Sequence, residues 1–161
     1  MLKPALAAHF RKYAEFHRHP VNRLTHQIAV PLIVFHIVAM LSWVTLAAPY
    51  GWSLTVAHVL VAAVVAWYLS LDLGLGVLMA LLYALCFPLA AVTPRSAVIA
   101  MAVVGWLIQL AGHVVWEKRS PAFLTNLLQA LIGPLFFVAV TVGVWPPERA
   151  SVLDLGGRRV G

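Results

Sequence analysis

Charged side chains are scarce in this sequence. Only 10% of its 161 residues are Asp, Glu, Lys or Arg, and 63% are hydrophobic, whereas soluble domains carry about 25% charged residues. This composition excludes an ordinary soluble domain and indicates an integral membrane protein. Acidic residues are fewer than basic ones, so the net charge is +6. The basic residues are scattered beside apolar runs, as is typical of charges that flank membrane spans, and they do not indicate a nucleic-acid partner.

Cysteine is nearly absent. The single residue, Cys86, lies inside an apolar run, so an intrachain disulfide is excluded and the redox compartment stays undetermined. The chain also lacks any shift of composition that would mark a second domain. We therefore predict one integral-membrane domain over residues 1–147, followed by a polar C-terminal tail at 148–161.

Long apolar runs predict an all-α fold. Residues 2–18 have helical periodicity with charges on one side, which predicts an amphipathic helix. Runs long enough to cross a hydrocarbon core of about 30 Å follow it, at about 26–48, 53–71, 74–92, 96–116 and 123–145. Gly133-Pro134 interrupts the last run, which therefore either crosses or re-enters. We predict a polytopic membrane helical bundle of about five transmembrane or re-entrant helices plus the N-terminal amphipathic helix.

Three polar residues interrupt the end of the fourth run. Gln109, His113 and Glu117 are spaced by four residues, so they fall on one face of a helix. A neutral imidazole and a carboxylate can bind the same cation, which suggests a pair of metal ligands. The alternative is a histidine and a salt-bridged glutamate at a membrane surface.

A second polar cluster precedes the first apolar run. It consists of His17, His19, Asn22 and His26. Counting the turns between spans places this cluster on the same side of the membrane as His113 and Glu117, together with Asp72. Lysine and arginine are more numerous on that side, which predicts that it is cytoplasmic. Imidazoles with a carboxylate are ligands of non-haem iron sites and of zinc sites, and the spacing does not choose between them.

The remaining histidines have structural explanations. His36 lies about 15 Å along the helix from His26, too far to share a metal, and is expected to bond a backbone carbonyl or a neighbouring helix. His58 is expected toward the opposite side. His19 is suited to capping the helix that begins at Pro20. Asp72 is either a supporting base or an interfacial loop residue.

Two spaced blocks of residues resemble a known family. The first block is Tyr13-x-x-Phe16-His17-x-x-Pro20-x-Asn22-x-x-x-His26-x-x-x-x-Pro31. The second block is Gly105-Trp106-x-x-Gln109-x-x-Gly112-His113-x-x-x-Glu117-Lys118-x-x-Pro121-x-x-x-x-Asn126-x-x-Gln129. Together they resemble the Fe(II)-dependent 2-hydroxy fatty acid dioxygenase family, whose best-known member acts in the fungal breakdown of phytosphingosine. The chain departs from the fungal pattern at Arg18, which replaces a second histidine, and at Ser120, which replaces an arginine.

The resemblance implies α-oxidation, in which a 2-hydroxy fatty acid and dioxygen give a fatty acid one carbon shorter. It implies Fe(II), in preference to zinc, on His17, His26 and His113. Glu117 is expected to be a fourth ligand or the acceptor that orients a histidine. The acyl tail is expected among the first, second and fourth spans. The residues expected to bind the substrate are Lys118, Arg119 and Asn126. Those expected to support the site are Asn22, Gln109 and Asp72.

Other functions stay open from the residues alone. A non-catalytic lipid-binding or scaffold protein would hold no stoichiometric metal, and a zinc-dependent lipid hydrolase would turn over without oxygen. Haem held between two histidines ranks last, because His36 and His58 lie at different predicted depths. The expected partners are membrane lipid and a 2-hydroxy long-chain fatty acid. The expected location is the bacterial inner membrane or the endoplasmic reticulum.

Overall fold

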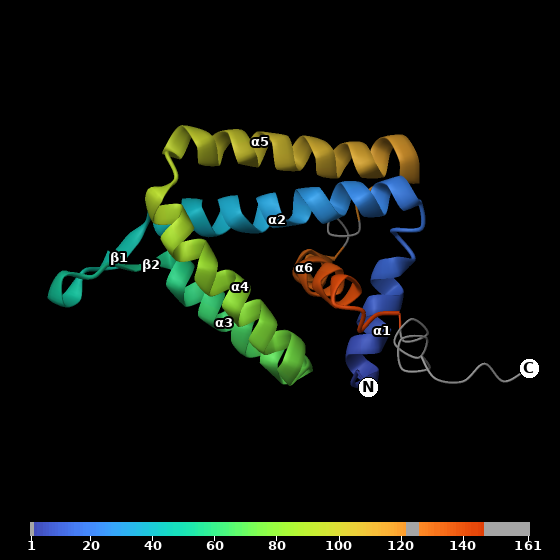
Figure 1. Cartoon of the computed structure of the whole chain (residues 1–161), viewed down its shortest axis with the longest axis horizontal. Coiled ribbons are helices and arrows are strands. Elements are labelled where there is room, and N and C mark those ends of the chain that lie inside the picture. Colours follow the sequence, from blue (N-terminus) through green and yellow to red (C-terminus); the bar gives the residue numbers. More distant parts are fainter. Residues whose placement is uncertain (1, 122–125, 147–161) are drawn as a thin grey trace, which may run out of the picture.

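The computed structural model describes residues 2–121 and 126–146. Over these residues the chain forms six α-helices, one π-helical segment and a small β-hairpin (Figure 1). The predicted all-α class is therefore confirmed. The predicted C-terminal tail at 148–161 lies outside the described residues.

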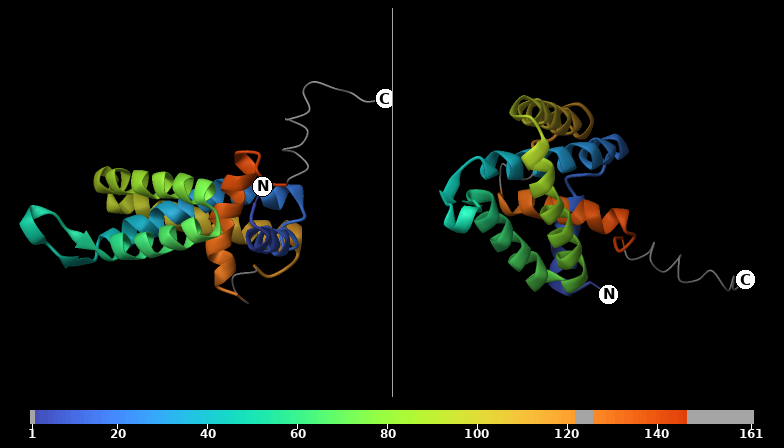
Figure 2. Two further views of the ribbon diagram at one scale, coloured as in Figure 1. Left: turned by 90° about the horizontal axis from the view of Figure 1, so that it is seen from below. Right: turned by 60° about the vertical axis from the view of Figure 1, so that its left-hand side comes forward.

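Two long antiparallel helices form one side of the molecule. They are α2 (Pro20–Ser42) and α5 (Arg95–Ala111), which lie side by side in Figures 1 and 2. Helix α5 continues into the π-helical segment η2 (Gly112–Glu117). Helix α2 begins with a proline in its first turn, and Nδ1 of His19 accepts a hydrogen bond from the Val21 N–H at 3.2 Å. The predicted capping role of His19 is confirmed.

A second helical pair diverges from the first. Helices α3 (Val56–Leu71) and α4 (Leu73–Val92) form a tight antiparallel hairpin that leaves the α2–α5 pair at an angle (Figure 1). Asp72 links them, and its Oδ1 accepts a hydrogen bond from the Leu75 N–H at 3.0 Å, which caps α4. Gly76 permits the close approach, because a Cβ there would lie 2.7 Å from the Leu69 Cα.

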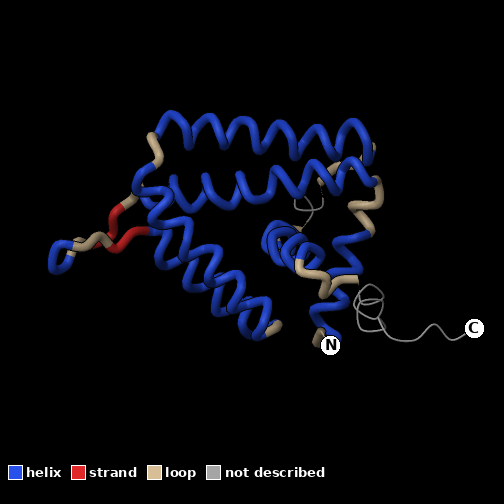
Figure 3. The backbone as a smooth tube through the Cα atoms, in the orientation of Figure 1, coloured by secondary structure: helices blue, strands red, loops and turns tan. Residues whose placement is uncertain are grey.

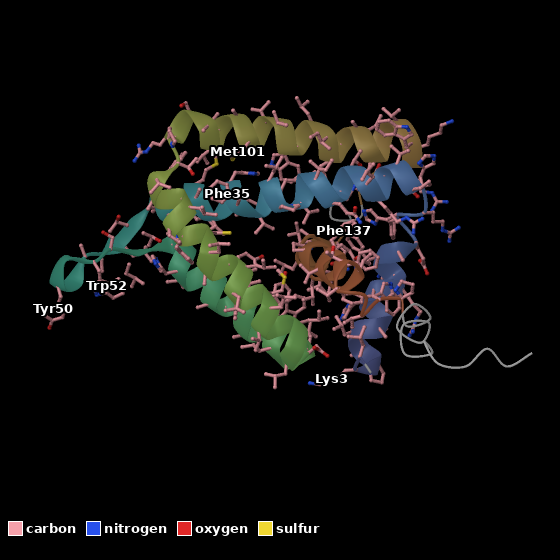
Figure 4. The ribbon with its side chains drawn as sticks, viewed as in Figure 1. Lys3, Phe35, Tyr50, Trp52, Met101 and Phe137 are labelled. Atoms are coloured by element: carbon pink, nitrogen blue, oxygen red, sulfur yellow. The ribbon has the colours of Figure 1, made fainter. Side chains whose placement is uncertain are left out.

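A β-hairpin separates α2 from α3, where the sequence predicted only a turn. Strands β1 (Thr45–Ala47) and β2 (Leu54–Thr55) pair antiparallel around the 3₁₀ turn η1 (Pro49–Gly51), as Figure 3 shows. The run predicted at 26–48 is therefore a helix only as far as Ser42. The hairpin extends away from the helices and carries the exposed ring of Tyr50 at its tip (Figure 4).

The first and last helices pack together at the end of the bundle opposite the β-hairpin (Figure 1). Helix α1 (Pro4–Ala14) buries its apolar face, as predicted for an amphipathic helix, although it ends before the predicted residue 18. Helix α6 (Leu128–Thr141) packs against α1, with Phe10 and Phe136 edge to face at 5.5 Å between ring centroids. It continues through Pro134, so the Gly-Pro pair does not break it. Residues 123–125 of the predicted fifth run lie outside the described residues.

The apolar helices differ in whether they are long enough to cross a membrane. Three helices in the described ranges are long and apolar enough to cross a membrane, and they are Pro20–Ser42, Leu73–Val92 and Arg95–Glu117. Helices α3 and α6 are apolar but shorter, roughly 24 and 21 Å at 1.5 Å per residue. Two contacts hold these shorter helices in place. The Tyr68 hydroxyl of α3 donates to the Leu131 carbonyl of α6 at 2.5 Å, and the Lys3 ammonium donates to the Ser70 carbonyl at 3.0 Å.

Two glycines of the α3–α4 hairpin should respond differently to alanine. Gly76→Ala should destabilise the protein by about 1–3 kcal/mol, because its Cβ would overlap the Leu69 backbone. Gly74→Ala is the control, since its nearest neighbour would be Asp72 Oδ1 at an ordinary 3.5 Å. Thermal unfolding in detergent should show a lower Tm for Gly76→Ala alone. Equal Tm values for the two variants would contradict the close approach at Gly76.

Candidate metal centre

Three histidines from separate elements meet in the interior. His17 comes from the turn between α1 and α2, His26 from α2, and His113 from η2. All three are buried, at 3%, 0% and 1% exposure. One ring nitrogen of each lies within 4.8 Å of the others. The structure thus brings together the two polar clusters that lie far apart in the sequence.

Hydrogen bonds fix the orientation of two of these rings. His17 Nδ1 lies 2.8 Å from the Tyr13 carbonyl oxygen, and His26 Nδ1 lies 2.8 Å from the Asn22 carbonyl oxygen. A carbonyl only accepts, so both Nδ1 atoms donate and both Nε2 atoms keep their lone pairs. His26 Nε2 faces His113 Nε2 at 3.0 Å. A backbone carbonyl behind the imidazole is the usual arrangement for a metal-ligating histidine.

Burial keeps the His17 imidazole neutral. The pKa of His17 is lowered to about 4, mainly by removal from water; His113 acts in the same direction, and the hydrogen bond to the Tyr13 carbonyl opposes it. The neutral form, which binds metals, is therefore the one present near neutral pH. The Tyr13 ring stacks on the imidazole with centroids 4.1 Å apart. The ring of Phe137, labelled in Figure 4, lies near the His26 imidazole, with ring centroids 5.8 Å apart.

The π-helical segment brings His113 against α2. Gly112 starts this segment, and a Cβ on it would lie 2.4 Å from both Asn22 Oδ1 and Thr25 Oγ1. No side chain fits there, so glycine permits the contact. The segment ends at Lys118, whose φ is 53°. Such π-helical turns within α-helices are frequent at functional sites. The sequence analysis predicted an ordinary helix here.

Glu117 holds the turn that carries His17. Its Oε1 accepts a hydrogen bond from the Arg18 N–H at 2.9 Å. Its Oε2 accepts from the His19 N–H and from Asn22 Nδ2, both at 3.0 Å. The group of three histidines does not include this carboxylate. The carboxylate thus accepts from the backbone of the turn and from Asn22, whereas the sequence predicted a fourth ligand or an acceptor that orients a histidine.

An apolar cavity of about 390 Å³ opens from the histidines. Its lining includes the polar side chains of His17, His113, Gln109 and Gln129. The rest is lined mainly by apolar side chains from α2, α3, α5 and α6. Helices α2, α3 and α5 are the three spans among which the sequence analysis expected an acyl tail. Helix α6 is an additional wall.

Several expected site residues lie elsewhere. Lys118 and Arg119 are exposed beyond η2 and are not among the residues that line the cavity. Asn126 Oδ1 accepts a hydrogen bond from the Leu128 N–H at 3.0 Å, so it supports the start of α6. Asp72 caps α4 at the end of the diverging α3–α4 hairpin, away from the histidines (Figure 1). Counting turns predicts which helix ends face the same side of the membrane, but it does not predict how far apart those ends lie on that side.

Two residues predicted to support the site contact it. Gln109 Nε2 donates to His26 Nε2 at 2.6 Å, and Asn22 Nδ2 donates to Glu117 Oε2. His36 donates to the Leu32 carbonyl at 3.0 Å. His58 accepts from the Thr55 N–H at the start of α3. The prediction that these two histidines stand apart from the site is confirmed.

Tyr13 and Gln129 line the cavity and stand in the two motif blocks, but neither received a role from the sequence. Gln129 is 2% exposed. Besides the motif, its signal was a polar residue within an apolar run, the same signal that singled out Gln109. For Tyr13 the motif was the signal, because a tyrosine on the apolar face of an amphipathic helix needs no special explanation.

The residues fit a divalent metal. His17 Nε2 and His113 Nδ1 are buried without a hydrogen-bond partner among the described residues, and such groups are costly unless something binds them. Three neutral imidazoles are a donor set for Fe(II) or zinc.

The fold and site define a helical protein with membrane-length helices and a three-histidine centre at the head of an apolar cavity. Residues 74–144 match a family model described as Mpo1-like, 2-hydroxy-palmitic acid dioxygenase Mpo1-like. The 2-hydroxy-palmitic acid dioxygenase MPO1 of Saccharomyces cerevisiae (strain ATCC 204508 / S288c) is 34% identical over 131 residues, which cover 78% of this chain and 72% of the yeast protein. The chain belongs to the Mpo1-like family, as its two motif blocks predicted. No solved structure matches it.

The role of Glu117 can be tested by an isosteric change. Glu117→Gln should lower the Tm, with a loss of about 1–3 kcal/mol, because an amide N–H would face a backbone N–H donor. Metal content should persist, since the histidines are untouched. Glu15→Gln, at an exposed carboxylate, is the control. Loss of metal from Glu117→Gln at an unchanged Tm would make Glu117 a ligand.

Proposed function

We propose that this protein is a membrane-embedded Fe(II)-dependent dioxygenase that shortens 2-hydroxy fatty acids by one carbon. The observation that carries the proposal is the convergence of His17, His26 and His113, of which His17 and His113 also line an apolar cavity. The activity named for the yeast relative supports the substrate class. Three apolar helices of membrane-spanning length support access from a lipid phase.

The reaction balances with dioxygen alone. A 2-hydroxy acid and O₂ contain the atoms of the acid one carbon shorter plus those of CO₂ and water. The bond between C1 and C2 breaks, and C2 becomes the new carboxyl carbon. This oxidation removes four electrons from the substrate, the number that one O₂ accepts. The balance therefore calls for no separate reductant.

The three histidines would hold the metal as neutral ligands. Bound iron would supply the redox chemistry with dioxygen that amino-acid side chains lack. Zinc accepts the same donors but has no redox chemistry, so it does not suit an oxidation. Because the imidazoles add no charge, a divalent ion would keep its full positive charge at the head of the cavity. That charge would favour a carboxylate there.

The cavity would receive the acyl chain. It extends along α2 from Val30 to Leu41, roughly 16 Å at 1.5 Å per residue. Burial of each methylene away from water is worth about 0.8 kcal/mol. An acid placed with its head at the histidines would have its C1–C2 bond at the site and its tail among apolar side chains. This arrangement explains why the site is built at the end of apolar helices.

His113→Ala should abolish both metal binding and activity. We expect substoichiometric iron after anaerobic loading, and a fall of more than about 100-fold in oxygen uptake with 2-hydroxypalmitic acid. Elemental analysis, an oxygen electrode and mass spectrometry for the acid one carbon shorter provide the measurements.

His36→Leu is the matched control. It removes a buried imidazole from the same bundle, but one that bonds only the Leu32 carbonyl among the contacts described. Metal content and oxygen uptake should match the wild type. Wild-type iron in His113→Ala would refute the ligand assignment, and turnover without oxygen would favour a hydrolase.

A further inference from the structure

Gln129 presents a buried polar group with nothing to bind it. Its side chain lies in the first turn of α6 and is 2% exposed. Neither Nε2 nor Oε1 has a hydrogen-bond partner among the described residues. An unpaired buried amide costs about 1–3 kcal/mol, so a group that binds only in the functional complex is expected opposite it.

The position of Gln129 identifies where that group lies. Gln129 lines the same cavity as His17 and His113. Gln109 lines it too, and its Oε1 is likewise buried without a partner in the described chain. The adjacent residues Ala130 and Leu131 also line the cavity. The first turn of α6, which carries the positive end of the helix dipole, therefore borders the cavity in which the acid would lie.

The chemistry of a carboxamide matches a 2-hydroxy acid. Its NH₂ donates and its carbonyl accepts, side by side on one carbon. A 2-hydroxy acid presents a carboxylate that accepts and a hydroxyl that donates, on adjacent carbons. An acid without the 2-hydroxyl would leave the amide carbonyl unpaired, and sites built to bond a hydroxyl discriminate strongly against analogues that lack it.

No charged side chain competes for this role. The cavity-lining residues within the described ranges include no Asp, Glu, Lys or Arg. Lys118 and Arg119 are exposed on η2 and its end. The charge of the acid must then be offset at the histidines, and the polar side chains can supply orientation and selectivity.

We propose that the Gln129 carboxamide binds the head group of the acid, donating to the carboxylate and accepting from the 2-hydroxyl. This inference rests on the proposed function. It makes Gln129 the residue that distinguishes a 2-hydroxy acid from the corresponding fatty acid and holds the C1–C2 bond at the histidines.

The test compares Gln129→Leu with Gln27→Leu in the full-length, Fe(II)-loaded protein. Gln27 undergoes the same chemical change but is exposed on α2 and is not among the residues that line this cavity. Iron content is measured first, and then anaerobic binding of 2-hydroxypalmitate and of palmitate. We expect Gln129→Leu to keep its iron and to lose about 10- to 100-fold in affinity for 2-hydroxypalmitate. Palmitate affinity should fall much less, so the preference for the hydroxy acid should collapse.

The outcomes separate this inference from the proposed function. If the wild type binds iron and consumes oxygen while Gln129→Leu keeps the full preference for 2-hydroxypalmitate, the inference is wrong and the proposed function stands. Loss of iron from a folded Gln129→Leu would make the residue structural and would also overturn the inference. If the wild type neither binds iron nor consumes oxygen, the proposed function itself fails.

A second variant decides the case in which Gln129→Leu does not fold. Gln129→Glu keeps the shape of the side chain but places a carboxylate beside that of the acid. It should weaken binding of 2-hydroxypalmitate by at least about 10-fold more than binding of uncharged 1,2-hexadecanediol. Equal effects on the two compounds, or no effect on either, would exclude Gln129 from contact with the carboxylate.

Discussion

The close contact between α2 and the π-helical end of α5 is the constraint on which the site depends. Gly112 lies so near Asn22 and Thr25 that no side chain fits between them. This approach places His113 Nε2 3.0 Å from His26 Nε2. Glu117, at the end of the same segment, then reaches the α1–α2 turn through its two carboxylate oxygens. The close approach of Gly112 to side chains of α2 thus aligns two histidines, and the same segment fixes the turn that carries the third.

The polar groups of this region are satisfied unevenly. Backbone carbonyls and the Glu117 carboxylate take up most donors, whereas the buried side-chain atoms without a partner in the described chain all belong to five residues, namely His17, Asn22, Gln109, His113 and Gln129. Each of these residues is one of the three histidines, bonds one of them or lines the cavity. Their concentration at one place is the expected signature of a site whose ligands complete the hydrogen bonding, since unpaired buried groups elsewhere would only lower stability.

The shape of the bundle serves this site. The α3–α4 hairpin diverges from the α2–α5 pair (Figure 1), and α6 and α1 close the end near the histidines. The divergence leaves the apolar cavity between α2, α3, α5 and α6. The Lys3 and Tyr68 hydrogen bonds link the separate helices across this arrangement. A parallel four-helix packing would fill the same space with side chains and leave no room for an acyl chain.

The sequence by itself determined the helical class, the amphipathic α1 and the membrane-length apolar runs, because period and length are local properties. It also determined that the two histidine blocks belong together, through the count of turns and the family motifs. It separated His36 and His58 correctly, since distance along a helix follows from residue number.

Only the tertiary structure decided the rest. The β-hairpin, the π-helical segment, the destination of the Glu117 carboxylate and the separation of Asp72 from the histidines depend on contacts between elements remote in sequence. Gln129 belongs with them. Its amide stands in the second motif block without a predicted role, and it becomes a candidate for substrate recognition because it is buried in the lining of the cavity without a partner in the described chain. Lateral packing is not encoded in any local pattern, so it emerged only when the helices were placed together.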